Sequence, residues 1–196
     1  PGLGAGNVHH MDQQTAAVNV TQEVVTQTCT VSSTFKGINL YSCGDVLVDG
    51  CTLSTTALRQ SLTYCLELSN CGDVTVSNTH ANAISRLFHL YNSKAVTVSN
   101  CTLTADYMEN LPGTALEVSG NTSLHMEDTA IHAVIAAADL SSMDKVSVDN
   151  CTFSSSDPDS LTSYADTCVS ISRIGSVGIS DTSVTGEHAM SLSQCD

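Results

Sequence analysis

The stretch AVTVSNCTL, Ala95–Leu103, decides the fold because it recurs along the chain. Close copies are DVLVDGCTL at Asp45–Leu53 and KVSVDNCTF at Lys145–Phe153. Each copy holds a short alternating apolar run, two polar residues and a second short run, which predicts two strands that meet at a tight corner. The copies lie 22 to 31 residues apart, and their first apolar residues are Val24, Val46, Val74, Val96, Leu124, Val146 and Val177.

The second corner position holds Asn, Asp or Gly in six of the seven copies. These residue types best tolerate a left-handed backbone. They are Gly50, Asn78, Asn100, Asp128, Asn150 and Asp181.

A third apolar-polar-apolar triplet ends six residues before each copy begins, as in Phe88–Leu90 and Leu116–Val118. Three strands per repeat, none long enough to fold alone, describe one coil of a solenoid that buries its inner face only against neighbouring coils. No window carries a sustained helical period. We therefore predict an all-β parallel β-helix of about seven coils, each made of three short strands.

From Ala16 to its end the chain resembles the right-handed parallel β-helices of the pectin lyase-like superfamily. In that superfamily a two-residue turn with a stacked Asn ladder joins the second strand to the third, and Ser99–Asn100 and Asp149–Asn150 look like such turns. The resemblance also implies a cleft over the first strand, beside the long turns that follow the third strand. It implies an architecture and no particular activity.

The ends of the chain depart from the repeat. Residues 1–15 are expected to form a linker or a weak cap, and residues 16–196 the β-helix domain. The final AMSLSQCD matches the opening of a coil, so we expect a fragment of a longer array. Open solenoid ends present unpaired strand edges, which favours oligomers formed through them.

Composition excludes several partners. Six Lys and Arg against 20 Asp and Glu give a formal net charge of -14, which disfavours nucleic acid and anionic lipid surfaces. No apolar run approaches the length of a membrane span, so we expect no membrane insertion. With no Trp and three Phe, the core must be largely aliphatic.

The nine cysteines are best interpreted as thiols within the core. Equivalent residues of successive coils stack about 4.8 Å apart, so Cys101 and Cys151, two coils apart, are separated by about 9.6 Å, beyond disulfide reach. Cysteines on adjacent coils can bridge, although an odd total leaves at least one thiol over. No C-x-x-C pair supports a metal site. The two adjacent pairs are Cys29 with Cys51, and Cys43 with Cys71.

Polar side chains stack along the outside of the first strand. Three carboxylates and a histidine follow one another there, at spacings of about 5 and 10 Å that approach those between glycosidase carboxylates. Catalysis, binding of a ligand or of a cation such as Ca²⁺, and a plain solvated surface all remain open. The column is Asn39, Glu67, His89, Glu117, Asp139, Ser170 and Ser191, of which Glu67, His89, Glu117 and Asp139 are the catalytic candidates.

The long turns supply further binding candidates, because each contains a Tyr: Tyr64, Tyr107 or Tyr164. With Asn39 they complete the predicted binding set. The leading hypothesis is a non-catalytic module of an extracellular or cell-surface protein, such as an adhesin, that binds glycans or proteins through a polar groove and long loops.

Two other functions remain. The first is a polysaccharide-degrading enzyme, a glycoside hydrolase or lyase, that works over the first-strand face. Lyases of the superfamily rely on Arg or Lys, and none of the six basic residues falls on the outward column. The second is an intracellular scaffold, which the thiols would suit.

Overall fold

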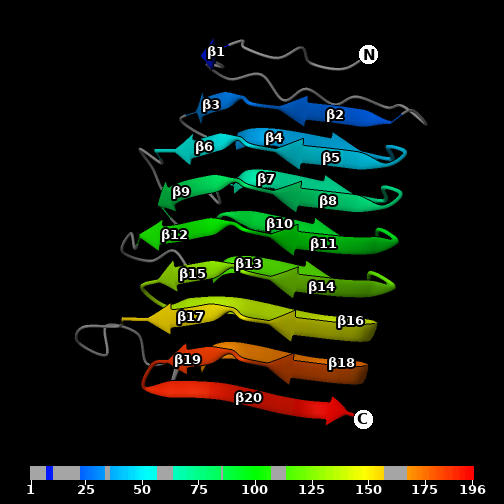
Figure 1. The fold of residues 1–196 in the computed structure, drawn as a ribbon, viewed down its shortest axis with the longest axis vertical. Helices are drawn as coiled ribbons and strands as arrows, with labels where there is room; N and C mark the ends of the chain where they lie inside the picture. Colours follow the sequence, from blue (N-terminus) through cyan, green and yellow to red (C-terminus); the bar gives the residue numbers. More distant parts are fainter. Residues whose placement is uncertain are drawn as a thin grey trace.

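The fold is described here from a computed structural model, in which residues 8–10, 23–33, 36–56, 64–84, 86–106, 114–156 and 167–196 are described. Short strands stack along one axis into a rod, and every strand pair is parallel (Figure 1). No helix occurs among these residues. The predicted all-β parallel β-helix is confirmed.

The strands form three faces. The first face contains β4 (Lys36–Tyr41), β7 (Tyr64–Ser69), β10 (Phe88–Tyr91), β13 (Thr114–Ser119), the first parts of β16 (Ala136–Asp149) and β18 (Thr167–Ser180), and β20 (His188–Cys195). The second face contains β2 (Val24–Gln27), β5 (Val46–Asp49), β8 (Val74–Ser77), β11 (Ala95–Ser99), β14 (Ser123–Glu127) and the later parts of β16 and β18.

The third face is a separate sheet. Its strands are β1 (Val8–His10), β3 (Thr30–Ser33), β6 (Thr52–Thr55), β9 (His80–Ile84), β12 (Thr102–Asp106), β15 (Ala130–Ala133), β17 (Thr152–Ser155) and β19 (Ser183–Thr185). The first two faces count as one sheet because β16 and β18 run unbroken through the corner between them.

The core consists of vertical files of matching side chains. Val74 pairs with Val46 on one side and Val96 on the other, and Val96 pairs with Leu124. These four side chains are buried, like their equivalents on the other faces. The predicted ladders are therefore confirmed, and they are aliphatic as composition required.

Every positive φ among the described residues lies at one of two corners of the coil. The corner between the second and third faces was predicted, and Thr28 completes its file with a φ of 48°. The corner between the first and second faces was missed because its residue types vary widely. Its residues are Ser42, Asn70, Asn92, Gly120, Ser142, Arg173 and Gln194.

Side-chain hydrogen bonds link the predicted corners from coil to coil. The amide of Asn100 donates to Oδ1 of Asn78 at 2.6 Å, and that of Asn78 donates to Oδ1 of Asp49 at 2.7 Å. Asn150 donates in the same way to Asp128 at 2.7 Å. The corner ladder thus joins successive coils through side chains, in addition to the backbone bonds that the N–H groups of Asn78, Asn100 and Asn150 make to neighbouring coils.

The residue after this corner points inward; it is Cys in the first two coils, Cys29 and Cys51, and alternates between Thr and Cys from Thr79 onward. The hydroxyl of Thr79 donates to the carbonyl of Ser77 at 2.8 Å and accepts from the backbone N–H of Cys51 at 3.4 Å. Thr129 makes the equivalent bonds with Glu127 and Cys101. No disulfide joins any of the nine cysteines, all but two of which are buried, as expected for thiols within the core.

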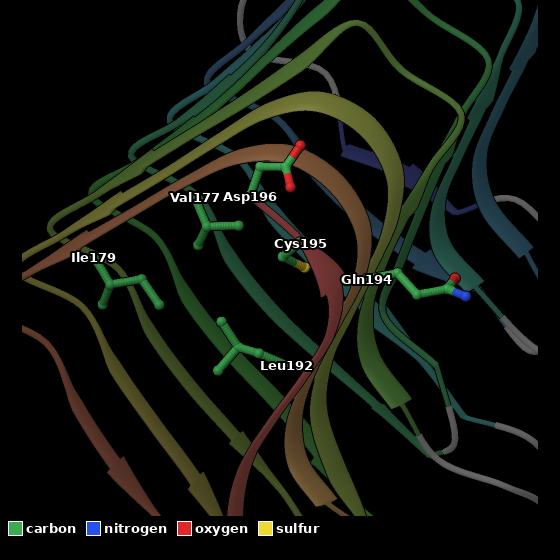
Figure 2. Close-up of a pocket in the computed structure, with 6 residues that line it drawn as sticks. All are labelled: Val177, Ile179, Leu192, Gln194, Cys195 and Asp196. Carbon is green, nitrogen blue, oxygen red and sulfur yellow. The ribbon is translucent and has the colours of Figure 1, made fainter.

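The C-terminal end of the rod exposes its core. Val177 and Ile179 continue inward files of the second face, and Leu192 continues one of the first. Ile179 is 38% exposed and Leu192 53% exposed. With Gln194, Cys195 and Asp196, these three line a hollow of about 400 Å³ (Figure 2). Association through such an end stays a prediction.

We expect Asn100→Ala to lower the free energy of unfolding by about 2 kcal/mol. The variant loses the hydrogen bond to Asn78, and alanine tolerates the left-handed backbone at a φ of 49° less well than asparagine. Asn100→Gly keeps the left-handed backbone and should lose about half as much. Chemical denaturation followed by circular dichroism measures both. Equal stability of the three proteins would contradict a stabilising corner ladder.

Candidate functional site

The outward column on the first face has the predicted order. Glu67 pairs with Asn39 on one side and His89 on the other, and His89 pairs with Glu117. Asp139 follows Glu117. The four proposed catalytic residues therefore lie on successive rungs, as the repeat spacing required.

The three tyrosines proposed for binding have different outcomes. Tyr107 and Tyr164 lie outside the described residues. Tyr64 was expected in a long turn but is the first residue of β7, where it pairs with Lys36 of β4. Its side chain is buried because neighbouring basic side chains and His89 cover the ring.

Two basic side chains reach the column although neither residue belongs to it. Nζ of Lys36 lies 2.7 Å from Oε2 of Glu67. Nη1 of Arg86 lies 3.2 Å from Oε2 of Glu117 and donates to the hydroxyl of Tyr64 at 2.9 Å. As predicted, no basic residue belongs to the column, but repeat spacing does not show that these two long side chains extend across the face to its carboxylates.

His89 occupies the centre of the site. Its ring stacks on Tyr64 at 5.2 Å and on Tyr91 at 4.4 Å between centroids. Nδ1 of His89 lies 3.7 Å from Oε1 of Glu67, and Nε2 lies 3.9 Å from Oε2 of Glu117. We call this group the His89 cluster: Lys36, Tyr64, Glu67, Arg86, His89, Tyr91 and Glu117.

The carboxyl groups of the column have opposite pKa shifts. His89, followed by Lys36, holds the pKa of Glu67 at about 2 against the effect of burial. Burial raises the pKa of Glu117, although Arg86 and His89 oppose it. Burial likewise raises the pKa of Asp139. One carboxylate thus stays ionised while its neighbours take up a proton more readily, a combination suited to acid–base chemistry.

Three buried side-chain atoms of the described residues have no hydrogen-bond partner, and all three lie on this face. They are Oδ1 of Asn39, Nε of Arg86 and Nδ1 of His89. Buried polar atoms are nearly always hydrogen-bonded in native proteins. The face therefore holds a donor and an acceptor that no group of the described residues uses.

In the described part of the chain, no three His, Cys, Asp or Glu side chains are arranged to hold a metal ion. Within that part, no helix has the length and apolarity needed to cross a membrane.

We expect Glu67→Gln to lower the free energy of unfolding at neutral pH by about 2 kcal/mol, because Lys36 and His89 lose an ionised partner. Because folding lowers the pKa of Glu67, its ionised carboxylate contributes fully to the stability of the wild-type protein above pH 4.5, the ordinary pKa value. This contribution is lost as the pH falls toward 2.

Denaturation curves at several pH values should therefore show a shallower decline for Glu67→Gln than for the wild type below pH 4.5. Glu127→Gln removes an exposed carboxylate from the second face and is the control. The same change of slope in both variants would contradict the assignment.

Comparison with known proteins agrees with the geometry. A family model described as "Right handed beta helix region" matches residues 6–131. No curated protein and no solved structure matched the chain. The parallel coils and this match together show that the chain belongs to the right-handed β-helix family.

Proposed function

We propose that this chain is a non-catalytic β-helix module of an extracellular or cell-surface protein, and that its first face binds a neutral glycan over the His89 cluster. The observation that carries the proposal is the unused hydrogen-bonding capacity of Asn39 and Arg86 on this face. A sugar hydroxyl both donates and accepts a hydrogen bond. Asn39 lies two rungs, or about 9.6 Å, from the rung of His89, beside Arg86, so different hydroxyl groups of one bound glycan would satisfy the two groups.

The chemistry around these atoms also suits a sugar. Glu67 stays ionised and is an acceptor for hydroxyl groups. Tyr41 and Tyr91 are half-buried, point outward from the same strand position, and are two rungs apart, which is about 9.6 Å. Their rings offer apolar surface with a polar edge, which fits the mixed character of a pyranose.

Charge narrows the class of glycan. The chain carries a net charge of -14, and Lys36 and Arg86 are already paired with carboxylates. A polyanionic polysaccharide would meet this net repulsion, and neither Lys36 nor Arg86 would be available to neutralise it. A neutral polysaccharide that lies along the column, parallel to the rod axis, is therefore favoured.

We expect the module to bind at least one neutral glycan on an array that also carries acidic polysaccharides. Asn39→Ala and Arg86→Lys should each weaken binding about 10-fold, since each removes one hydrogen bond from a buried site. Arg86→Lys keeps the positive charge, so it tests the guanidinium Nε and not the ion pair.

Ser170→Ala and Ser191→Ala change the same column beyond the His89 cluster and are matched controls. They should bind like the wild type. Binding to no glycan, or an equal loss in the controls, would contradict the proposed site.

Glycan hydrolysis is the second candidate, and the opposite pKa shifts of Glu67 and Glu117 favour it. Two rungs separate these residues by about 9.6 Å at the backbone, near the separation in inverting glycosidases. Glu117 would be the acid and Glu67 the base. The pairing of Glu67 with Lys36 lowers its basicity, which is why the binding function comes first.

If the chain hydrolyses glycans, reducing ends will accumulate from the bound polysaccharide, and Glu117→Gln will lower the rate at least about 100-fold. Because the pKa of Glu117 is raised, activity should persist to a higher pH than an ordinary carboxylic acid allows. Binding of a glycan without release of reducing ends would support the non-catalytic binding module and exclude the hydrolase.

A further inference from the structure

Four of the nine cysteines form two pairs on adjacent rungs. Cys29 and Cys51 occupy the corner between the second and third faces, where the N–H of Thr52 donates to the carbonyl of Cys29 at 2.8 Å. Cys43 and Cys71 occupy the corner between the first and second faces, where the N–H of Gly72 donates to the carbonyl of Cys43 at 3.2 Å. Each pair therefore stacks directly.

The spacing of adjacent rungs fits a disulfide. Neighbouring strands lie about 4.8 Å apart, and disulfides form when the two Cα atoms are about 4.4–6.8 Å apart. The thiols of each pair already interact: a hydrogen bond from Cys29 lowers the pKa of Cys51 and raises that of Cys29. Burial and the nearby Cys71 raise the pKa of Cys43 to about 11.

The other five cysteines have no cysteine on an adjacent rung. Cys101 stacks between Thr79 and Thr129, and Cys151 between Thr129 and Thr182. Cys195 lies opposite Ile174. Cys65 and Cys168 occupy the start of first-face strands, where the register places Gly37, Leu87 and Ala137 beside them. Only Cys29, Cys51, Cys43 and Cys71 therefore lie next to another cysteine on an adjacent rung.

We propose that Cys29 with Cys51, and Cys43 with Cys71, are covalent modification sites that close into two disulfides by exchange with a small-molecule disulfide. Both pairs flank β5, since Cys43 precedes this strand and Cys51 follows it. The bridges tie β5 to β8 at its start and to β2 at its end.

The exchange at each pair has two steps. One cysteine thiolate attacks a sulfur of the small disulfide, which forms a mixed disulfide and releases one small thiolate. The second cysteine, as its thiolate, attacks the protein sulfur of the mixed disulfide and releases the other small thiolate. The two cysteines are oxidised, the small disulfide is reduced by two electrons, and the two cysteine protons end on the released thiols.

The position of the bridges gives them a physical effect. In a linear array each coil is stabilised only by its neighbours, so coils toward an end are held least. The bridges close loops over residues 29–51 and 43–71, which restricts the unfolded chain. The coils that contain β2, β5 and β8 would then separate less readily.

The test incubates the reduced, folded protein with oxidised glutathione, blocks remaining thiols and digests with trypsin without reductant. Cleavage after Lys36, Arg59 and Arg86 puts Cys29 on one peptide, Cys43 with Cys51 on a second and Cys71 with Cys65 on a third, so the Cys71→Ser variant identifies which of the last two is linked. We expect one species of three linked peptides, and a melting temperature raised by roughly 5–10 °C that reductant reverses.

The variants make the result specific. Cys51→Ser should leave only the second and third peptides linked, and Cys71→Ser only the first and second. Cys101→Ser and Cys151→Ser should link like the wild type. Glutathione adducts without linked peptides, links to Cys101 or Cys151, or no reaction would each overturn the proposal. Circular dichroism shows that each variant is folded, and the two pair variants report independently.

Discussion

The structure depends on the return of each coil to the same register one rung above the last. Two left-handed corners in each coil from β4 to β19 make this return possible, because they turn the chain sharply without adding residues that would shift the alternation of side chains. A shift of one residue would carry an inward file such as Val46, Val74 and Val96 to the outside. The same register therefore places the core files inside the rod and the outward column on its surface.

The same stacking creates the electrostatics of the first face. Glu67 and Glu117 lie two rungs apart, and His89 lies on the rung between them and faces both carboxylates. Lys36 and Arg86 then neutralise the two carboxylates from the side. The pKa of Glu67 is lowered, chiefly by His89, whereas the pKa of Glu117 is raised, chiefly by burial. The two carboxyl groups therefore shift in opposite directions although both face the same histidine.

Stacking also decides the chemistry available to the cysteines. At the corner position shared with Thr79 and Thr129, a small inward side chain is required, and either a thiol or a hydroxyl fits. Alternation with Thr keeps Cys101 and Cys151 apart, whereas Cys29 and Cys51 meet because their coils lack this alternation. Whether the adjacent coil carries Thr or Cys at this position thus determines whether a cysteine only packs in the core or can form a disulfide.

The sequence by itself determined the parallel β-helix, the inward files, one corner ladder and the order of Asn39, Glu67, His89 and Glu117, because all of these follow from a fixed repeat. Only the tertiary structure decided how side chains reach across a face. Lys36 and Arg86 join the column through their length, and Tyr64 is buried against His89, which no repeat spacing encodes. The second corner was hidden for a related reason: stacking imposes its left-handed backbone even on Ser142 and Arg173.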